Sequence, residues 1–286
     1  MKSTASKIRG NVAIHAMRPS SIRSLTTTAR LRAATPPPAS ENGAINPRWL
    51  SDLQKRLQQS LSLKIAPKKV DEVRERLAYL DKNWLELAAG REGFLVDPER
   101  RGLDRHMVQW GDMDMMLHSN DVFTSQGHVN NVIYNRLAES GRVNWTRNLA
   151  QFSDPKYQQE WYDLMSPKSI GLILASIRTD FKFPMTFPDR VTVLHKLVTK
   201  PDYSSDRFYL EAVMYSEQQR RPAAKCFEDI VVYDYRAAKK APLKPFMVDE
   251  LQATYDLQEQ RKMEAEKKVT ELQAFVQQVE EGAGAA

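Results

Sequence analysis

The chain has 286 residues, 42% of them hydrophobic, and a formal net charge of +6. Residues 1–40 hold seven of the 42 basic residues and no acidic residue, which leaves 35 basic against 36 acidic residues elsewhere. The excess positive charge therefore belongs to the amino-terminal leader, and the composition argues against a nucleic-acid-binding domain. The single cysteine, Cys226, excludes a disulfide within the chain, and its apolar neighbours favour a buried, unreactive thiol.

The leader is also rich in serine and threonine, a composition typical of a mitochondrial transit peptide. We therefore predict a transit peptide and a proline-rich linker over residues 1–40, and a location in the mitochondrial matrix. A disordered tail is the alternative interpretation. No apolar run reaches the roughly 18 residues that span a bilayer, so we expect no membrane span.

Residues 41–100 show a helical pattern with one interruption. Apolar residues recur at three- to four-residue spacing before and after Pro67, which suits the first turn of a second helix, and Gly90 is expected to end that helix. We interpret this segment as a helical extension that docks on the main domain or on a partner.

A polar turn between a strand and a long helix is the most informative segment of the chain. The apolar run at 106–110 predicts a short strand, and Gly127 to Tyr134 form a turn that leads into a helix. The helix carries one apolar stripe with a glycine in it: Val129, Ile133, Leu137, Gly141, Trp145 and Leu149. Because glycine costs about 1 kcal/mol in a helix relative to alanine, we expect another backbone to approach Gly141 closely.

Four strands are predicted after this helix, at 170–181, 191–199, 206–217 and 225–235. Pro184 and Pro188 between the first two forbid regular pairing of those neighbours. One strand, one helix and then four strands without intervening helices predict an antiparallel α+β domain over 101–243. Residues 244–286 read as a charged helix to about Glu280 and a disordered tail, with a narrow apolar seam: Val269, Leu272, Val276 and Val279.

The turn and its surroundings resemble the signature of hotdog-fold acyl-CoA thioesterases of the 4-hydroxybenzoyl-CoA thioesterase-like group. The matching residues are Gly111-Asp112-Met113-Asp114, Gly127-His128-Val129-Asn130-Asn131 and Glu139-Ser140-Gly141-Arg142. The resemblance implies an antiparallel sheet wrapped around a long central helix, here with helical extensions at both ends. One departure is clear, because twelve residues, Met115 to Gln126, separate the second acid from the glycine where the family has about two.

The resemblance implies roles for particular residues. Asp114 matches the family's base or nucleophile, and the backbone N–H of Asn131 matches its oxyanion donor. His128 is a further catalytic candidate, while Gly127 and Asn130 complete the substrate-binding turn. Glu139 is the alternative base, since related enzymes use a glutamate on this helix.

Each of these residues also has a simpler interpretation. Asp114 can end a strand, Asn130 and Asn131 can cap the helix, and His128 can be structural. Glu139 can form an ion pair with Arg142 three residues later. His195 reads as a half-buried core histidine.

The family implies an acyl-CoA thioesterase that needs no metal or redox cofactor, with CoA entering as part of the substrate. It also implies at least a homodimer, because dimerisation closes the exposed sheet edge and the pocket. A non-catalytic hotdog subunit or scaffold of a mitochondrial assembly is the alternative, motivated by the insertion and by the terminal helices, which could bind a protein partner.

Overall fold

The computed structural model describes residues 48–63, 65–113 and 127–284. The predicted leader and linker at 1–40, Asp114, the insertion Met115 to Gln126, and the last two residues of the tail lie outside the described residues. Among the described helices, none is long and apolar enough to cross a membrane.

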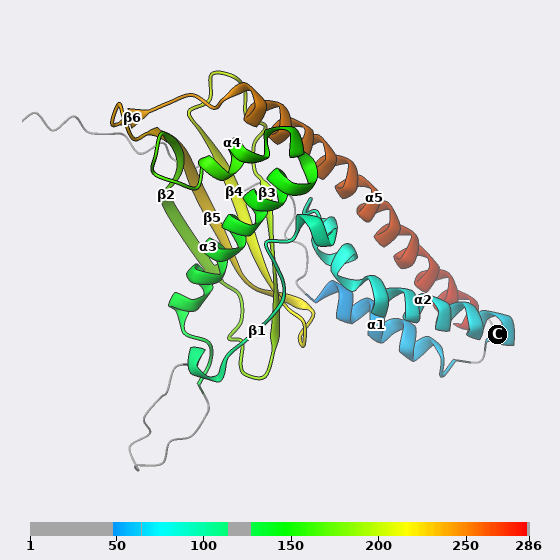
Figure 1. Ribbon diagram of the computed structural model, residues 1–286. Coiled ribbons are helices and arrows are strands. Elements are labelled where there is room, and N and C mark those ends of the chain that lie inside the picture. The colour runs from blue at the N-terminus through cyan, green and yellow to red at the C-terminus, as the bar shows by residue number, and fades with distance from the viewer. Residues whose placement is uncertain (1–47, 64, 114–126, 285–286) are drawn as a thin grey trace, which may run out of the picture. The chain divides into compact units, whose positions relative to one another are not determined.

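A single antiparallel sheet forms the centre of the fold (Figure 1). Its strands are β1 (Leu103–Met107), β2 (Ile170–Phe181), β3 (Arg190–Leu197), β4 (Arg207–Ser216), β5 (Arg221–Asp234) and the short β6 (Lys239–Lys240). The strand order is β1-β3-β4-β5-β2, with β6 paired to β5. The consecutive strands β2 and β3 are not neighbours, as the prolines between them predicted.

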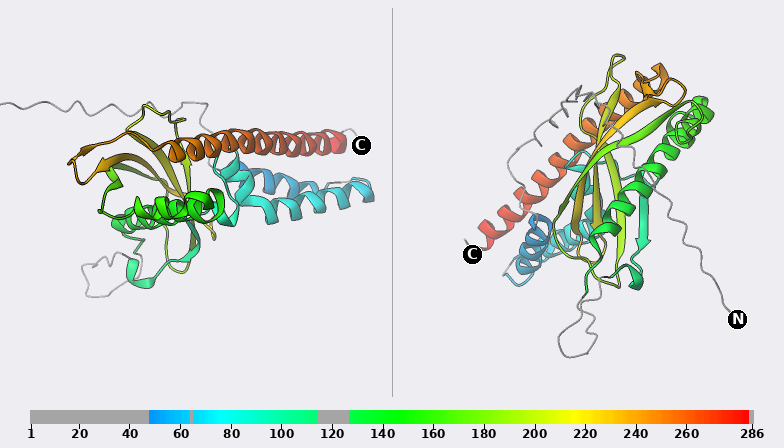
Figure 2. Two further views of the ribbon diagram at one scale, coloured as in Figure 1. Left: turned by 45° about the horizontal axis from the view of Figure 1, so that its top comes forward. Right: turned by 90° about the vertical axis from the view of Figure 1, so that its left-hand side faces the viewer.

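The helix α3 (Asn131–Asn148) lies against one face of this sheet (Figures 1 and 2). Its close approach depends on Gly141. A Cβ atom at this position would lie 2.8 Å from His195 Cε1 and 2.9 Å from Val193 Cγ1, both on β3. The backbone of Gly102 also meets Gly141, since a Cβ on Gly102 would lie 2.7 Å from the Gly141 carbonyl oxygen. The predicted backbone approach at this glycine is therefore confirmed, and the arrangement is the hotdog fold with additional terminal helices.

On the opposite side of the sheet from α3, the terminal helices pack against β3 and β4 and extend beyond the strands (Figure 2). These are α1 (Trp49–Ser60), α2 (Pro67–Leu85), the π-helical turn Glu86–Gly90 and α5 (Pro245–Gly284). Pro67 is the first residue of α2, as predicted. The seam of α5 packs with α1 and α2 in one apolar cluster, which also includes Leu194, Val213 and Tyr215 from β3 and β4. The helical extension therefore docks on its own domain.

Short helical segments complete the chain. They are Pro98–Arg100, Trp110–Asp112, Leu149–Ser153, Pro155–Tyr157 and α4 (Gln158–Asp163). With the carboxy-terminal half of α3 and the start of α5, α4 closes a second cluster around Trp145, Trp161 and Phe246. A third cluster, around Tyr134 and Met214, lies between the first half of α3 and the sheet.

Three expectations from the sequence are wrong in detail. The first strand ends at Met107 instead of Trp110, because the Asp112 carboxylate accepts the Gln109 N–H at 3.0 Å and closes a 3₁₀ turn. The last helix continues to Gly284, past the predicted end at about Glu280, and Glu280 itself pairs with Arg56 at 2.6 Å. His195 is 1% exposed and not half-buried, because α3 covers it.

Candidate active site

The predicted turn forms the start of α3. Asn130 is the residue that caps the helix, and its side-chain oxygen accepts the Val132 N–H at 2.8 Å. Asn131 is the first helical residue, and its backbone N–H has no acceptor among the described residues. This amide therefore remains able to donate to a ligand, at the end of the helix that carries partial positive charge.

The strand exit that precedes the insertion lies directly against this turn. Met113 forms an antiparallel bridge with Val129, and the Asn130 N–H donates to the Asp112 carbonyl oxygen at 2.9 Å. The described residues on either side of the twelve-residue insertion therefore lie side by side. Asp114, the predicted base, follows Met113 directly and lies outside the described residues.

The connection between β2 and β3 holds the turn from another side. The Val129 N–H donates to the Met185 carbonyl oxygen at 2.8 Å, and the Met185 N–H donates to the Tyr134 hydroxyl oxygen at 3.2 Å. Gly127 and Val129 are buried, whereas His128 is partly exposed and Asn131 is exposed. The turn thus combines a fixed backbone with accessible polar groups.

Glu139, the alternative base, occupies a different part of α3. It is exposed, and it lies eight residues after Asn131, about 12 Å along the helix axis at 1.5 Å per residue. A general base must come within about 3 Å of the proton that it removes, directly or through one water. Within one chain, the structure therefore does not bring Glu139 to the amide of Asn131.

The expected ion pair between Glu139 and Arg142 is replaced by a buried one. Arg142 Nη1 lies 2.6 Å from Glu228 Oε1 on β5, and the Glu228 side chain is fully buried. His195 on β3 completes the cluster, with its Nε2 atom 3.8 Å from Glu228 Oε2, beyond hydrogen-bond distance. We call these three residues, Arg142, His195 and Glu228, the buried cluster.

Burial dominates the protonation of the buried cluster. It raises the pKa of Glu228 to about 7, although the guanidinium of Arg142 opposes this shift. Burial, together with the charge of Arg142, lowers the pKa of His195 to about 3, so that its imidazole is neutral at physiological pH.

Sequence reasoning missed Glu228. A signal was present, since in a strand residues two apart share a face, and Glu228 lies on the inward face with Cys226 and Ile230. Cys226 itself is buried as predicted, and burial raises the pKa of its thiol to about 11.

The family follows from the sequence match. Residues 108–251 match the profile of the thioesterase-like superfamily, which is half of the chain and includes the turn, α3 and all strands from β2 to β6. The chain belongs to this superfamily.

The solved structures that resemble part of this chain include proteins with thioesterase in their names. The PA2801 protein of Pseudomonas aeruginosa is 20% identical with a TM-score of 0.37, and the match covers 50% of this chain and 91% of that chain. A thioesterase of Thermus thermophilus, solved with coenzyme A and zinc, is 17% identical with a TM-score of 0.36, covering 50% and 93%. The gentisyl-coenzyme A thioesterase BH1999 is 18% identical with a TM-score of 0.36, covering 52% and 95%. No curated protein matched the sequence.

Proposed function

We propose that the protein is an acyl-CoA thioesterase of the 4-hydroxybenzoyl-CoA thioesterase-like kind. Membership of the thioesterase-like superfamily supports thioester hydrolysis in general. The observation that supports an acyl-CoA thioesterase in particular is the bridge between Met113 and Val129. This bridge joins the segment that directly precedes Asp114 to the start of α3.

The proposed reaction uses one carboxylate and one amide. Asp114 takes a proton from water as the water oxygen attacks the carbonyl carbon of the thioester. The Asn131 N–H donates to the oxygen that becomes negatively charged, and the Asn130 cap keeps this amide in place. The intermediate then expels the CoA thiolate, which takes the proton held by Asp114, and leaves a carboxylic acid. His128 is proposed to contact the thioester from the same turn.

Exposed apolar side chains on the elements that meet at this turn support binding of an acyl group beside it. Trp110, Val132 and Phe187 are 56%, 62% and 43% exposed. The Phe187 N–H also lies 3.4 Å from the sulfur of Met113, which places that loop beside the bridge.

We further propose a homodimer formed along β2. This strand has twelve residues, and among the described residues it pairs only with β5, so its other edge carries unpaired N–H and C=O groups. A long edge with apolar residues such as Ile173 and Ile177 favours pairing with another chain. Light scattering of the full chain checks this: we expect Ala175→Glu, an exposed change on this strand, to weaken the dimer, and Ala237→Glu, in the β5–β6 turn, to leave it intact.

The composition of residues 1–40 supports a mitochondrial location. Fusion of this segment to a fluorescent protein checks it, and a fusion that stays in the cytosol would contradict it.

A panel of acyl-CoA thioesters tests the activity. The purified full chain is incubated with short, long and aromatic acyl-CoAs, and release of the free CoA thiol is followed. We expect hydrolysis of at least one class. A folded protein that hydrolyses none would support the alternative, a non-catalytic hotdog subunit.

A further inference from the structure

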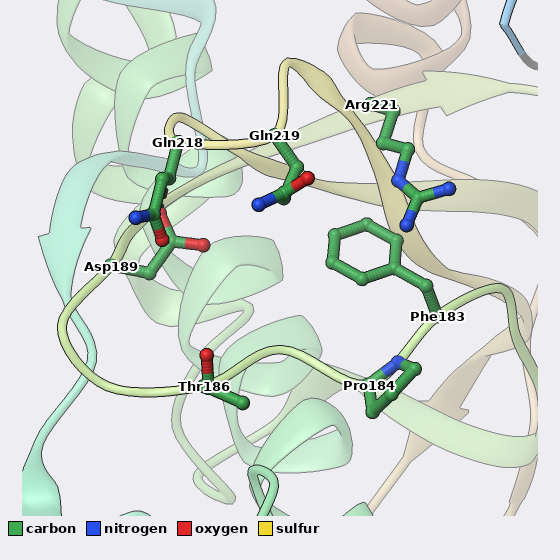
Figure 3. Close-up of a pocket in the computed structure, with 7 residues that line it drawn as sticks. All are labelled: Phe183, Pro184, Thr186, Asp189, Gln218, Gln219 and Arg221. Carbon is green, nitrogen blue, oxygen red and sulfur yellow. Dashed lines mark hydrogen bonds between the residues drawn. The ribbon is translucent and has the colours of Figure 1, made fainter.

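A polar cavity lies between the β2–β3 connection and the turn that joins β4 to β5 (Figure 3). Its volume is about 200 Å³, and its walls include Phe183, Thr186, Gln218, Gln219 and Arg221. Thr186 lies next to Met185, which contacts the start of α3, but the cavity contains none of the residues of the proposed thioester site. It therefore needs its own explanation.

Arg221 brings an unneutralised positive charge to this cavity. Its guanidinium carbon lies 4.0 Å from the centre of the Phe183 ring, which fixes the side chain from one side. No carboxylate within the described ranges forms an ion pair with it, and its buried Nε atom has no hydrogen-bond partner. The guanidinium that lines the cavity therefore keeps its charge available to a ligand.

Among the described residues that line the cavity, Asp189 is the only one with a carboxylate, and it forms no ion pair with Arg221. Its Oδ2 atom accepts the Ser216 hydroxyl at 2.5 Å, and its Oδ1 atom accepts the N–H groups of Arg190 at 2.6 Å and Gln218 at 3.1 Å. These bonds tie the β2–β3 connection to the β4–β5 turn and hold the cavity open as a fixed frame. The donors left for a ligand are the guanidinium, the Thr186 hydroxyl and two amide side chains.

Figure 3 shows these groups around one space, with Arg221 beside Phe183 and Gln219 between them and Asp189. A guanidinium with neutral hydrogen-bond donors suits an oxyanion, because arginine presents a planar fork of N–H groups. The volume limits the size of the ligand. Pockets for whole drug-sized molecules measure about 300–1,000 Å³, so this cavity fits a small charged group and not an entire acyl-CoA.

We propose that this cavity is a binding site for a phosphate group, with Arg221 as its charged anchor. The phosphate is either a free anion or the end of a larger molecule whose remainder lies outside the cavity. This assignment does not depend on thioester hydrolysis, since it concerns binding at residues that the reaction does not use.

Binding titrations test the proposal with the full chain. Thermal shift and calorimetric titrations use inorganic phosphate against chloride at equal ionic strength, and then CoA against dephospho-CoA. The test variant is Arg221→Gln. The matched control is Arg220→Gln, which removes the same charge from the neighbouring residue, because Arg220 pairs with Asp81 at 2.6 Å outside the cavity.

We expect saturable phosphate binding by the wild type and Arg220→Gln, and at least about tenfold weaker binding by Arg221→Gln, as loss of a charge-assisted bidentate contact implies. A second result would also support the site: CoA binds, inorganic phosphate does not, and CoA binding depends on Arg221 in the same way. Weaker binding of dephospho-CoA would then identify the phosphate as part of the larger molecule. Arg221→Lys and Thr186→Val are more conservative variants, and each should weaken binding by a smaller factor. Equal affinities of Arg221→Gln, Arg221→Lys and the wild type for all of these probes would overturn the proposal.

Discussion

The two halves of α3 use polar residues in opposite ways. At its start, Asn131 and His128 remain accessible, and the Asn131 amide has no acceptor within the described part of the chain. About three turns later, Arg142 is almost enclosed and its charge is matched by the fully buried Glu228. The first arrangement leaves donors for a substrate, whereas the second satisfies charges inside the core. The comparison separates polar groups that can meet a substrate from polar groups that stabilise the core of the same helix.

Removal of Arg142 should produce the largest loss of stability. Above pH 7, where Glu228 is ionised, Arg142→Met leaves its carboxylate buried without a cation, and breaking such a pair costs about 3–5 kcal/mol. Urea denaturation measures this cost. Arg136→Met, an exposed change on the same helix, should stay within about 0.5 kcal/mol of the wild type.

The double variant Arg142→Met/Glu228→Leu sharpens the same point. Because it removes both charges, it should recover much of the stability that the single variant loses. A double variant as unstable as Arg142→Met would show that packing, and not the unpaired charge, causes the loss.

The buried cluster should also set a pH dependence of stability. Glu228 ionises near 4.5 in the unfolded chain and near pH 7 in the folded one, so its contribution to stability falls as the pH rises between these values. His195 has the opposite effect, because its pKa falls from 6.5 to about 3 on folding and its contribution rises with pH in that window. The two slopes oppose each other between pH 4.5 and 6.5, and each approaches at most about 1.4 kcal/mol per pH unit.

Glu228→Gln removes one of these slopes and keeps the shape of the side chain. The stability of the wild type relative to this variant should fall as the pH rises from 4.5 to 7. Urea denaturation at several pH values in this range measures the difference. Parallel curves for the two proteins would contradict the assigned protonation of Glu228.

The helix cap should give the smallest change in stability. Asn130→Ala removes the oxygen that accepts the Val132 N–H and should cost about 1 kcal/mol. It should also lower the rate of thioester hydrolysis, because the Asn131 amide loses its support. Asn130→Asp retains an acceptor oxygen and serves as the control. Equal rates of thioester hydrolysis for the two variants would show that the reaction does not depend on the helix cap.

Much of the fold could be predicted from local patterns. The stripe on α3 and the alternation of Phe208, Leu210 and Ala212 along β4 follow directly from helix and strand periods, and all three β4 residues are buried. Gly141 predicted the close backbone contact that the structure contains. The candidate turn could be predicted because its residues are neighbours in sequence.

The buried cluster could not be predicted in the same way, because Arg142 and Glu228 are 86 residues apart and meet only after the sheet forms. The rule that oppositely charged residues three apart on a helix form ion pairs predicted a pair of Arg142 with Glu139 instead. The sequence also did not predict that α1, α2 and α5 would pack on the outer face of β3 and β4. An apolar seam such as that of Val269 and Val276 fits several partners.

The most direct test of the central claim is the turnover number of Asp114→Asn with the acyl-CoA that the wild type hydrolyses best, measured beside Glu139→Gln. The account predicts a loss of about 10²–10⁴-fold for Asp114→Asn, the usual contribution of a general base, with binding of CoA retained. Glu139→Gln should stay close to the wild type, because Glu139 lies about two turns away from the Asn131 amide. Full activity of Asp114→Asn would contradict the assignment of the reaction to the start of α3. A large loss of activity in Glu139→Gln in place of Asp114→Asn would contradict it as well.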